Sequence, residues 1–167
     1  MAYHITGLEP SHATDCFICG QPSLEQYLRQ YARQDIRRRV SRVFVATVTE
    51  NPQVIAGYYT LSAGSVKCSE LPIHLGKKLP RYPIPVALLG RLAVATACQG
   101  QGLGAILLAD ACRRVHQASS LLGVYAILVD ALNDQAQAFY RHHGFIALPN
   151  QLTQWLLPLT TIAQAMK

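Results

Sequence analysis

Between residues 90 and 105 the sequence changes from a β pattern to a helical pattern through a glycine-rich turn. Residues 90–96 are typical of a strand, and glycines alternate at Gly100, Gly102 and Gly104 before apolar residues recur at helical spacing. The first turn of a helix leaves backbone N–H groups unpaired, and glycine lets an anion approach them closely. The segment therefore predicts a strand, a turn and a helix N-terminus suited to phosphate.

The hydrophobic pattern elsewhere predicts further strands and helices around this segment. Strands are expected at residues 3–6, 43–48, 54–63, 86–96, 124–129, 145–148 and 154–159, and helices at 102–117, at 133–143 and from an N-cap at Ser23. Residues 64–85 contain several prolines and indicate one long irregular connection. Strands joined by a crossover helix should be parallel, and hairpin neighbours antiparallel. We expect an α/β chain that forms a single domain over residues 1–167.

The composition limits where such a chain acts. No apolar run approaches the roughly 18 to 20 residues of a membrane span, and the N-terminus has no signal-peptide pattern. We therefore expect a cytoplasmic protein with no membrane association. Cys16 and Cys19 have the spacing of half a zinc site, but no second pair completes it. We expect no metal, and reduced, mostly buried thiols.

The charge is strongly basic and unevenly distributed. Fifteen Lys and Arg residues oppose nine Asp and Glu, which gives a formal net charge of +6. Six arginines lie between residues 29 and 42, and Lys77, Lys78 and Arg81 form a second cluster. This imbalance favours a polyanionic partner, although a basic helix end is also typical of a solvated face.

The glycine turn does not belong to the common nucleotide motifs. Residues 100–105 formally satisfy Gly-x-Gly-x-x-Gly/Ala, but the dinucleotide fingerprint belongs to the first strand–helix turn of a doubly wound sheet. Here the turn comes late, and no second mononucleotide half follows. No Gly-Lys-Ser/Thr follows either, which excludes a P-loop.

Two motifs in order resemble those of the GNAT acyltransferase superfamily. Gln99-Gly100-Gln101-Gly102-Leu103-Gly104 is similar to its Gln/Arg-x-x-Gly-x-Gly/Ala signature, and residues 133–145 resemble its second block. The resemblance extends over essentially the whole chain. It implies a GNAT fold with a mixed, mostly antiparallel sheet, a parallel splayed central pair and helices on both faces. It also implies acetyl-CoA as co-substrate.

The resemblance indicates which residues hold acetyl-CoA. Backbone groups for the pantetheine arm would come from Leu92, Ala93 and Val94. The pyrophosphate would lie against Gln99, Gly100, Gly102, Gly104 and Ala105. Asn133 would hydrogen-bond the cofactor, although asparagine is equally suited to an N-cap there.

Tyr140 is the catalytic candidate. In GNAT enzymes a tyrosine at this position protonates the departing CoA thiolate, while backbone N–H groups near Val94 would polarise the thioester carbonyl. A phenol of pKa about 10 does this only if the site shifts the pKa values or the proton moves as the bond breaks. The alternative is that Tyr140 is ordinary core beside Phe139.

A missing carboxylate bears on the acceptor. The chain has no Asp or Glu between Glu70 and Asp110, so the strand before the glycine turn offers no general base. A lysine amine, with a pKa near 10.4, would need one, whereas an α-amine, near 7.7 to 8.0, needs little help. The sequence therefore favours a weakly basic α-amine as the acceptor.

Residues 19–28, 32–38, 57–62 and 144–159 resemble the TacT/AtaT-type GNAT toxins of bacterial toxin–antitoxin modules. The resemblance implies acetylation of aminoacyl-tRNA, inhibition of translation, a ribbon-helix-helix antitoxin as partner and a homodimer. The tRNA-binding candidates are Arg29, Arg33, Arg37, Arg38, Arg39, Lys77 and Lys78. The alternatives are that these arginines hold an acidic antitoxin segment, that the acceptor is a protein N-terminus or a small amine, and that the chain is a non-catalytic CoA- or nucleic-acid-binding module.

Overall fold

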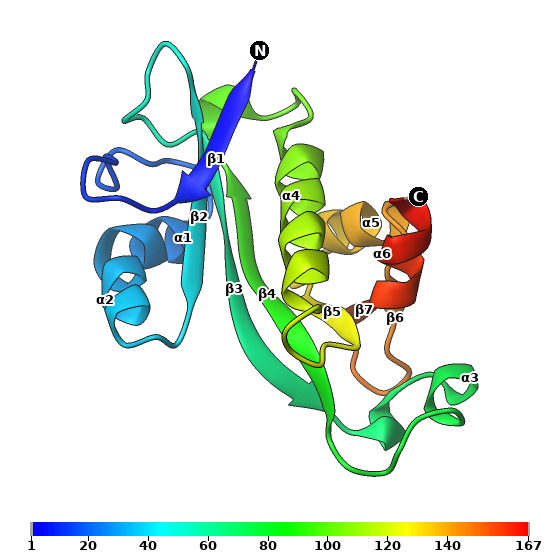
Figure 1. The fold of residues 1–167 in the computed structure, drawn as a ribbon. Helices are drawn as coiled ribbons and strands as arrows, with labels where there is room; N and C mark the ends of the chain where they lie inside the picture. The colour runs from blue at the N-terminus through cyan, green and yellow to red at the C-terminus, as the bar shows by residue number, and fades with distance from the viewer. Residues whose placement is uncertain (1, 167) are drawn as a thin grey trace. The chain divides into compact units, whose positions relative to one another are not determined.

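The computed structural model describes residues 2–166, in which strands and helices alternate (Figure 1). The strands are β1 (Tyr3–Gly7), β2 (Arg42–Val48), β3 (Gly57–Val66), β4 (Ile84–Val94), β5 (Ala126–Asp130), β6 (Ile146–Ala147) and β7 (Gln154–Pro158). The helices are α1 (Pro22–Gln26), α2 (Ala32–Arg37), α3 (Ile73–Gly76), α4 (Leu103–Ala118), α5 (Asp134–His142) and α6 (Leu159–Ala165). A π-helical turn, η1 (Tyr27–Tyr31), joins α1 to α2, and short 3₁₀ turns form at η2 (Cys68–Glu70) and η3 (Thr96–Cys98).

The strands form one seven-stranded sheet in the order β1-β2-β3-β4-β5-β7-β6. The pairs β1–β2, β2–β3, β5–β7 and β6–β7 are antiparallel, and β4–β5 is parallel. The parallel pair is the one whose strands are joined by the crossover helix α4, as the sequence predicts. The expectation of a mixed, mostly antiparallel sheet is confirmed.

The chain divides into two compact units. One contains the residues up to Ser62 together with Gly90–Ala111, and the other contains Ala63–Leu89 together with the residues from Cys112 onward. Each unit has its own core of buried residues. The expectation of one domain over residues 1–167 stays a prediction.

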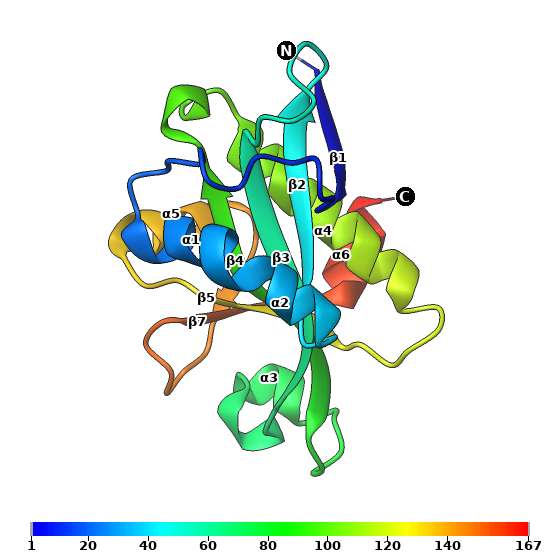
Figure 2. The same cartoon turned by 90° about the vertical axis from the view of Figure 1, so that its left-hand side faces the viewer.

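In the first unit, side chains that alternate along β3 meet helices on opposite faces. The Tyr58 hydroxyl donates to the Leu24 carbonyl of α1 at 2.6 Å, and its ring packs with Phe17 and Tyr27. The neighbouring residue Gly57 faces α4, where a Cβ would lie 2.9 Å from a methyl group of Leu107. Successive strand residues point to opposite faces, so helices cover both faces of this part of the sheet, as expected. Figure 2 shows α1 and α2 crossing the face of β2 and β3.

The N-terminal helix differs from its prediction. It begins at Pro22 rather than after Ser23, and Gln21 precedes it without a side-chain cap, since proline in the first turn needs no N–H partner. The π-helical turn then interrupts it, with the Ala32 amide donating to the carbonyl of Tyr27. Arg29 lies in this π-helical turn, whereas Arg33 and Arg37 lie in α2, so these arginines do not belong to one regular α-helix.

Residues 64–85 are more ordered than their prolines predict. β3 runs from Gly57 to Val66 and β4 begins at Ile84, so both strands extend into this segment. The short helical elements η2 and α3 form between them. Val66, Leu71 and Ile84 belong to the core of the second unit, because apolar side chains in this segment find partners far along the chain. The expectation of one long irregular connection is wrong.

The C-terminal helix α6 was not anticipated. The sequence predicts only a strand at 154–159, whereas β7 ends at Pro158 and α6 follows, burying Leu159 and Ile162. Of the cysteines, which are all free, Cys19 is buried, Cys16 is exposed and the other three are intermediate. The expectation that most of them are buried is wrong. Within residues 2–166, no helix combines the length and the apolar character that crossing a membrane requires.

The arginine segment ends in an unusual backbone conformation. After α2 the Arg39 amide donates to the Ile36 carbonyl and the Val40 amide to the Asp35 carbonyl, each at 3.0 Å, which is the Schellman motif. The residue after the C-cap of this motif adopts a left-handed conformation, normally at glycine, and here it is Arg39 with φ 62°. An arginine in this position costs conformational energy.

We expect the substitution Arg39→Gly to raise the free energy of unfolding by about 0.5 to 1 kcal/mol, because glycine adopts a positive φ without a Cβ clash. Urea denaturation of the purified protein measures this difference. Arg38→Gly is the matched control, since Arg38 has φ −79° and gains nothing from glycine. A loss of stability in Arg39→Gly equal to that in Arg38→Gly would contradict the explanation.

Candidate active site

The glycine turn is built as the sequence predicts. β4 ends at Val94, and α4 begins at Leu103 directly after the turn. Gly100 has φ 77° and Gly102 has φ 84°, conformations that side chains rarely adopt. A Cβ at either glycine would meet nothing within 4 Å, so the turn is open on that side. The first amides of α4, at Leu103 and the residues after it, have no partners within the helix and can bind an anion.

The end of β4 belongs to the first unit. β4 pairs with β5 from Val86 to Leu89 within the second unit and then continues to Val94. Leu92 and Val94 are half-buried, and Ala93 is buried in the core of the first unit. That the backbone of these three residues holds the pantetheine arm stays a prediction.

Gln99 braces the turn through its side chain. Its Nε2 donates to the carbonyl of Val94 and to the carbonyl of Cys19, both at 3.0 Å. An amide nitrogen carries two hydrogens, so both donors are committed to the protein. The side chain of Gln99 therefore shapes the turn, and any contact with pyrophosphate is left to backbone groups of this segment.

Glu25, which no sequence pattern singled out, holds the loop that contacts this turn. Its Oε2 accepts hydrogen bonds from the amides of Cys19 and Gly20, each at 2.9 Å. These two bonds, and the positive charge of Arg29, hold the pKa of Glu25 below its usual value. Both partners were among the residues whose resemblance was noted, but nothing local indicated that a carboxylate would hold them.

Asn133 and Tyr140 lie on the second unit. Asn133 precedes α5 as its N-cap, with Oδ1 accepting from the Ala136 amide at 2.8 Å. The N-cap interpretation is therefore confirmed, and a contact of its remaining amide group with a cofactor stays a prediction. Gly144, with φ 91°, ends this helix region as the sequence predicts.

Tyr140 combines a packed ring with an uncommitted hydroxyl. The side chain is 8% exposed, and its ring lies edge-on to Phe139 at 5.2 Å and to Phe145 at 5.1 Å. Burial raises the pKa of Tyr140 to about 12. Within the described residues 2–166 no group hydrogen-bonds its hydroxyl, and the oxygen is not one of the fully buried atoms that lack a partner. The ring of Tyr140 therefore packs in the core, as the alternative interpretation of this residue held. Its hydroxyl makes no hydrogen bond that would stabilise the fold.

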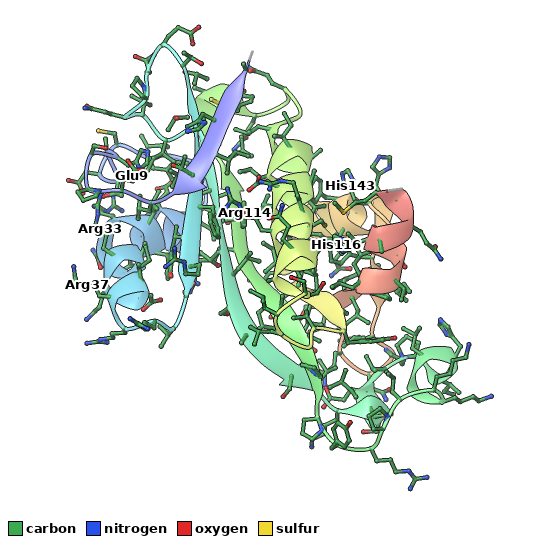
Figure 3. All side chains as sticks on the ribbon, viewed as in Figure 1. Glu9, Arg33, Arg37, Arg114, His116 and His143 are labelled. Carbon is green, nitrogen blue, oxygen red and sulfur yellow. The ribbon has the colours of Figure 1, made fainter. Side chains whose placement is uncertain are left out.

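The arginines of α2 are not equivalent. Arg33 is half-buried, and its guanidinium donates to Thr14 Oγ1 at 3.0 Å and to the carbonyls of His12 at 3.0 Å and Glu9 at 3.1 Å. Arg33 therefore holds the loop before α1. Glu9 and Arg33 are labelled in Figure 3. Arg37 is exposed. The other exposed candidates are Arg29, Arg38, Arg39, Lys77 and Lys78.

Arg91 on β4 is a second residue that the sequence analysis missed. Its guanidinium carbon lies 3.5 Å from the centre of the Tyr27 ring, and Tyr27 donates its hydroxyl to Asp35 at 2.9 Å. This cation–π contact joins β4 to the π-helical turn. A lone arginine in a strand gives no signal for such a contact, because the aromatic partner is distant in sequence. Within residues 2–166, no group of three or more His, Cys, Asp or Glu residues is placed to hold a metal ion.

The family of the chain follows from comparison with known proteins. Residues 39–147 match the family described as the acetyltransferase (GNAT) domain. The chain belongs to this family and is an N-acetyltransferase. The resemblance noted in the sequence is thereby confirmed.

Individual members of this family are similar to the chain over most of its length. The chain is 44% identical over 133 residues to a tRNA-acetylating toxin of Mycobacterium tuberculosis, covering 80% of this chain and 78% of that protein. It is similar to the structure of AtaT complexed with acetyl-methionyl-tRNAfMet, with a TM-score of 0.92, 30% identity and coverage of 99% and 100%. A tyrosine-to-phenylalanine mutant of AtaT, bound to acetyl-CoA and the C-terminus of the antitoxin AtaR, matches with a TM-score of 0.84, 27% identity and coverage of 99% and 98%.

We expect Arg33→Ala to lower the free energy of unfolding by about 1 to 3 kcal/mol, because it leaves the polar groups of the loop before α1 without their donor. Arg37→Ala, one helical turn later and exposed, is the matched control and should change it by less than about 0.5 kcal/mol. Urea denaturation followed by circular dichroism measures both. Equal losses in the two variants would contradict a bracing role for Arg33.

Proposed function

We propose that this chain transfers the acetyl group of acetyl-CoA to the α-amine of aminoacyl-tRNA and so inhibits translation. The observation that carries the proposal is Tyr140, a buried phenol whose hydroxyl has no protein partner in the described structure. The Tyr140 oxygen is not one of the fully buried atoms that lack a partner, so water or a ligand can reach it, and phenylalanine would pack as well without it; the retained hydroxyl favours a role with a ligand. In this proposal the chain acts as a single domain in the cytoplasm, where charged tRNA is found.

The donor half of the site is the turn between β4 and α4. Acetyl-CoA bound there would place its pyrophosphate on the open side of the glycines, against the first amides of α4, including Gly104 and Ala105. The pantetheine arm would hydrogen-bond the backbone of Leu92, Ala93 and Val94, and an N–H near Val94 would polarise the thioester carbonyl. Asn133 would add a contact through the part of its amide that the N-cap does not use.

Tyr140 would act as the general acid. The neutral α-amine attacks the thioester carbonyl and passes its surplus proton to water, the carbon–sulfur bond breaks, and the phenol gives its proton to the departing sulfur and regains one from solvent. Because burial raises the pKa of Tyr140 to about 12, the phenol keeps its proton near neutral pH. The thiolate of CoA leaves into the same poorly solvated surroundings, which also makes it a stronger base.

The proposed acceptor is inferred from the absence of a carboxylate on β4 and from the exposed basic residues. β4 carries no carboxylate to deprotonate a lysine, and esterification lowers the pKa of an amino acid's α-amine, so aminoacyl-tRNA reacts without a general base. The exposed arginines Arg29, Arg37, Arg38 and Arg39 would contact the phosphates of tRNA, together with Lys77 and Lys78. Arg33 is assigned to the fold, since its donors are engaged.

The partner is inferred from the solved relatives. AtaT is described in complex with the C-terminus of the antitoxin AtaR, and the same kind of partner is proposed for this chain. A ribbon-helix-helix antitoxin and a homodimeric toxin belong to the same proposal.

Incubation with labelled acetyl-CoA and a pool of charged tRNA tests the function directly. After deacylation of the tRNA, N-acetylated amino acids should carry the label. Peptides with free N-termini and polyamines, offered in the same reaction, are the competing acceptors. Label in those acceptors but not on tRNA would show that the chain acetylates another amine, and no transfer at all would favour a non-catalytic binding module.

For Tyr140→Phe we expect kcat to fall by about 10² to 10⁴-fold, because the proton donor is lost while the ring still packs. The dissociation constant for acetyl-CoA, measured by calorimetry, should hardly change. Tyr82→Phe is the matched control, since Tyr82 is 67% exposed and belongs to no part of the proposed site. Growth of cells that express each variant gives a second readout.

The pH profile provides an independent check on Tyr140. Since the raised pKa keeps the acid form intact, kcat/KM should rise as the α-amine loses its proton and should not fall again up to about pH 9, above which the aminoacyl ester and the thioester hydrolyse. A falling limb in the wild type, absent from Tyr140→Phe and centred below pH 10, would contradict an acid whose pKa is raised.

We expect the double substitution Arg37→Ala with Arg38→Ala to raise KM for charged tRNA and to reduce the slope of log K against log salt by about 2. The reason is that two phosphate contacts, each releasing about 0.9 of a counterion, are removed. Turnover of a minimal acceptor, such as an amino acid methyl ester, is the control and should persist. An equal fall with both acceptors would show that the arginines support the fold instead.

A further inference from the structure

Two consecutive peptide groups join α1 to the donor turn. They are the groups between Ile18 and Cys19 and between Cys19 and Gly20. On one side their amides, at Cys19 and Gly20, donate to the same oxygen of Glu25, each at 2.9 Å. The left-handed conformation of Gly20, with φ 90°, lets the chain bend so that both amides reach this oxygen.

On the other side, the carbonyls of the same two peptide groups accept hydrogen bonds from the donor turn. The Ile18 carbonyl accepts from the Thr96 amide at 2.8 Å, and the Cys19 carbonyl accepts from Gln99 Nε2 at 3.0 Å. In a trans peptide the N–H and C=O bonds point in opposite directions. Holding both amides towards Glu25 therefore aims both carbonyls at Thr96 and Gln99.

The chain of bonds continues to the end of β4. The Gln99 nitrogen that bonds the Cys19 carbonyl also donates to the Val94 carbonyl at 3.0 Å. Val94 is the last residue of β4, where the proposed thioester would be polarised. Glu25, the Cys19–Gly20 peptide group, Gln99 and Val94 thus form one continuous path of hydrogen bonds within the first unit, and the Ile18–Cys19 peptide group leads from Glu25 to Thr96 of the same turn.

We infer that Glu25 is a positioning residue of the acetyl-CoA site, acting through the Ile18–Gly20 backbone and Gln99 on the turn that binds the donor. This inference rests on the proposed donor site. A carboxylate is suited to the role because hydrogen bonds to an ionised acceptor are about twice as strong as neutral ones. It also polarises the two peptide groups, which makes their carbonyls better acceptors. The two amide bonds keep Glu25 ionised by holding its pKa low.

This path of hydrogen bonds accounts for three residues that have no role in the proposed chemistry. Gln99 has no free side-chain donor for a ligand, because it is the link between the loop and β4. Glu25 lies in the first turn of a short helix yet serves a loop rather than capping that helix. Cys19 is buried and contributes both of its backbone groups to the path.

Glu25→Ala tests the inference. We expect the dissociation constant of acetyl-CoA and its KM to rise about tenfold, while KM for the acceptor stays unchanged. Glu25→Gln keeps one neutral acceptor oxygen and should show a rise of about threefold, which also provides a reading if the alanine variant folds poorly. Glu50→Gln is the matched control, since Glu50 is an exposed carboxylate in a turn of the same unit and should leave all constants unchanged. All binding is measured by calorimetry well below the melting temperature of each variant.

A double-mutant cycle with Gln99→Ala separates positioning from general stability. If both residues act along one path, the effects on acetyl-CoA binding should be far from additive, with Gln99→Ala costing little more in the Glu25→Ala background. Additive effects, or a lower melting temperature with unchanged acetyl-CoA affinity, would overturn the inference. Wild-type protein that fails to bind acetyl-CoA would overturn the donor site itself, and an outcome in which acetyl-CoA binds normally but tRNA is not acetylated would overturn only the acceptor.

Discussion

Backbone polar groups near the end of β4 must find partners, and this requirement organises the site. Within the second unit β4 pairs with β5 from Val86 to Leu89, and the strand continues into the first unit to Val94. The peptide group that follows Val94 has partners in both directions, since the Ala95 amide donates to the Ala56 carbonyl and the Val94 carbonyl, which points the opposite way, accepts from Gln99. A buried backbone group without a partner costs free energy, so these bonds hold the end of the strand in place.

The chemistry proposed for Tyr140 depends on a hydroxyl group that makes no hydrogen bond within residues 2–166. Phenylalanine would fill the space between Phe139 and Phe145 equally well, and the hydroxyl adds no bond within the described structure. Burial raises the pKa of this phenol to about 12, so in the proposed reaction it would keep its proton until the leaving thiolate forms. A weakly acidic group would suit this role because the reaction itself would generate the base.

The arginine segment divides into residues that stabilise the fold and residues that face the solvent. Arg33 holds the loop before α1, whereas Arg39 occupies a left-handed position that glycine would fill with less strain. Strained residues often persist where function requires the side chain. Arg29 lies in the π-helical turn before α2, so the exposed arginines are not all carried by one regular α-helix.

The sequence alone determined the strand, the glycine turn and the helix at residues 84–118, the N-cap at Asn133 and the helix end at Gly144, because each depends on neighbours within a few residues. It also identified the family, since both motifs are local. Tertiary structure decided the order of residues 64–85, the π-helical turn and the C-terminal helix, where packing against distant residues outweighs local preference. It likewise decided the partners of Gln99, Arg33 and Arg91, because no local pattern records a hydrogen bond or ring contact between residues tens of positions apart.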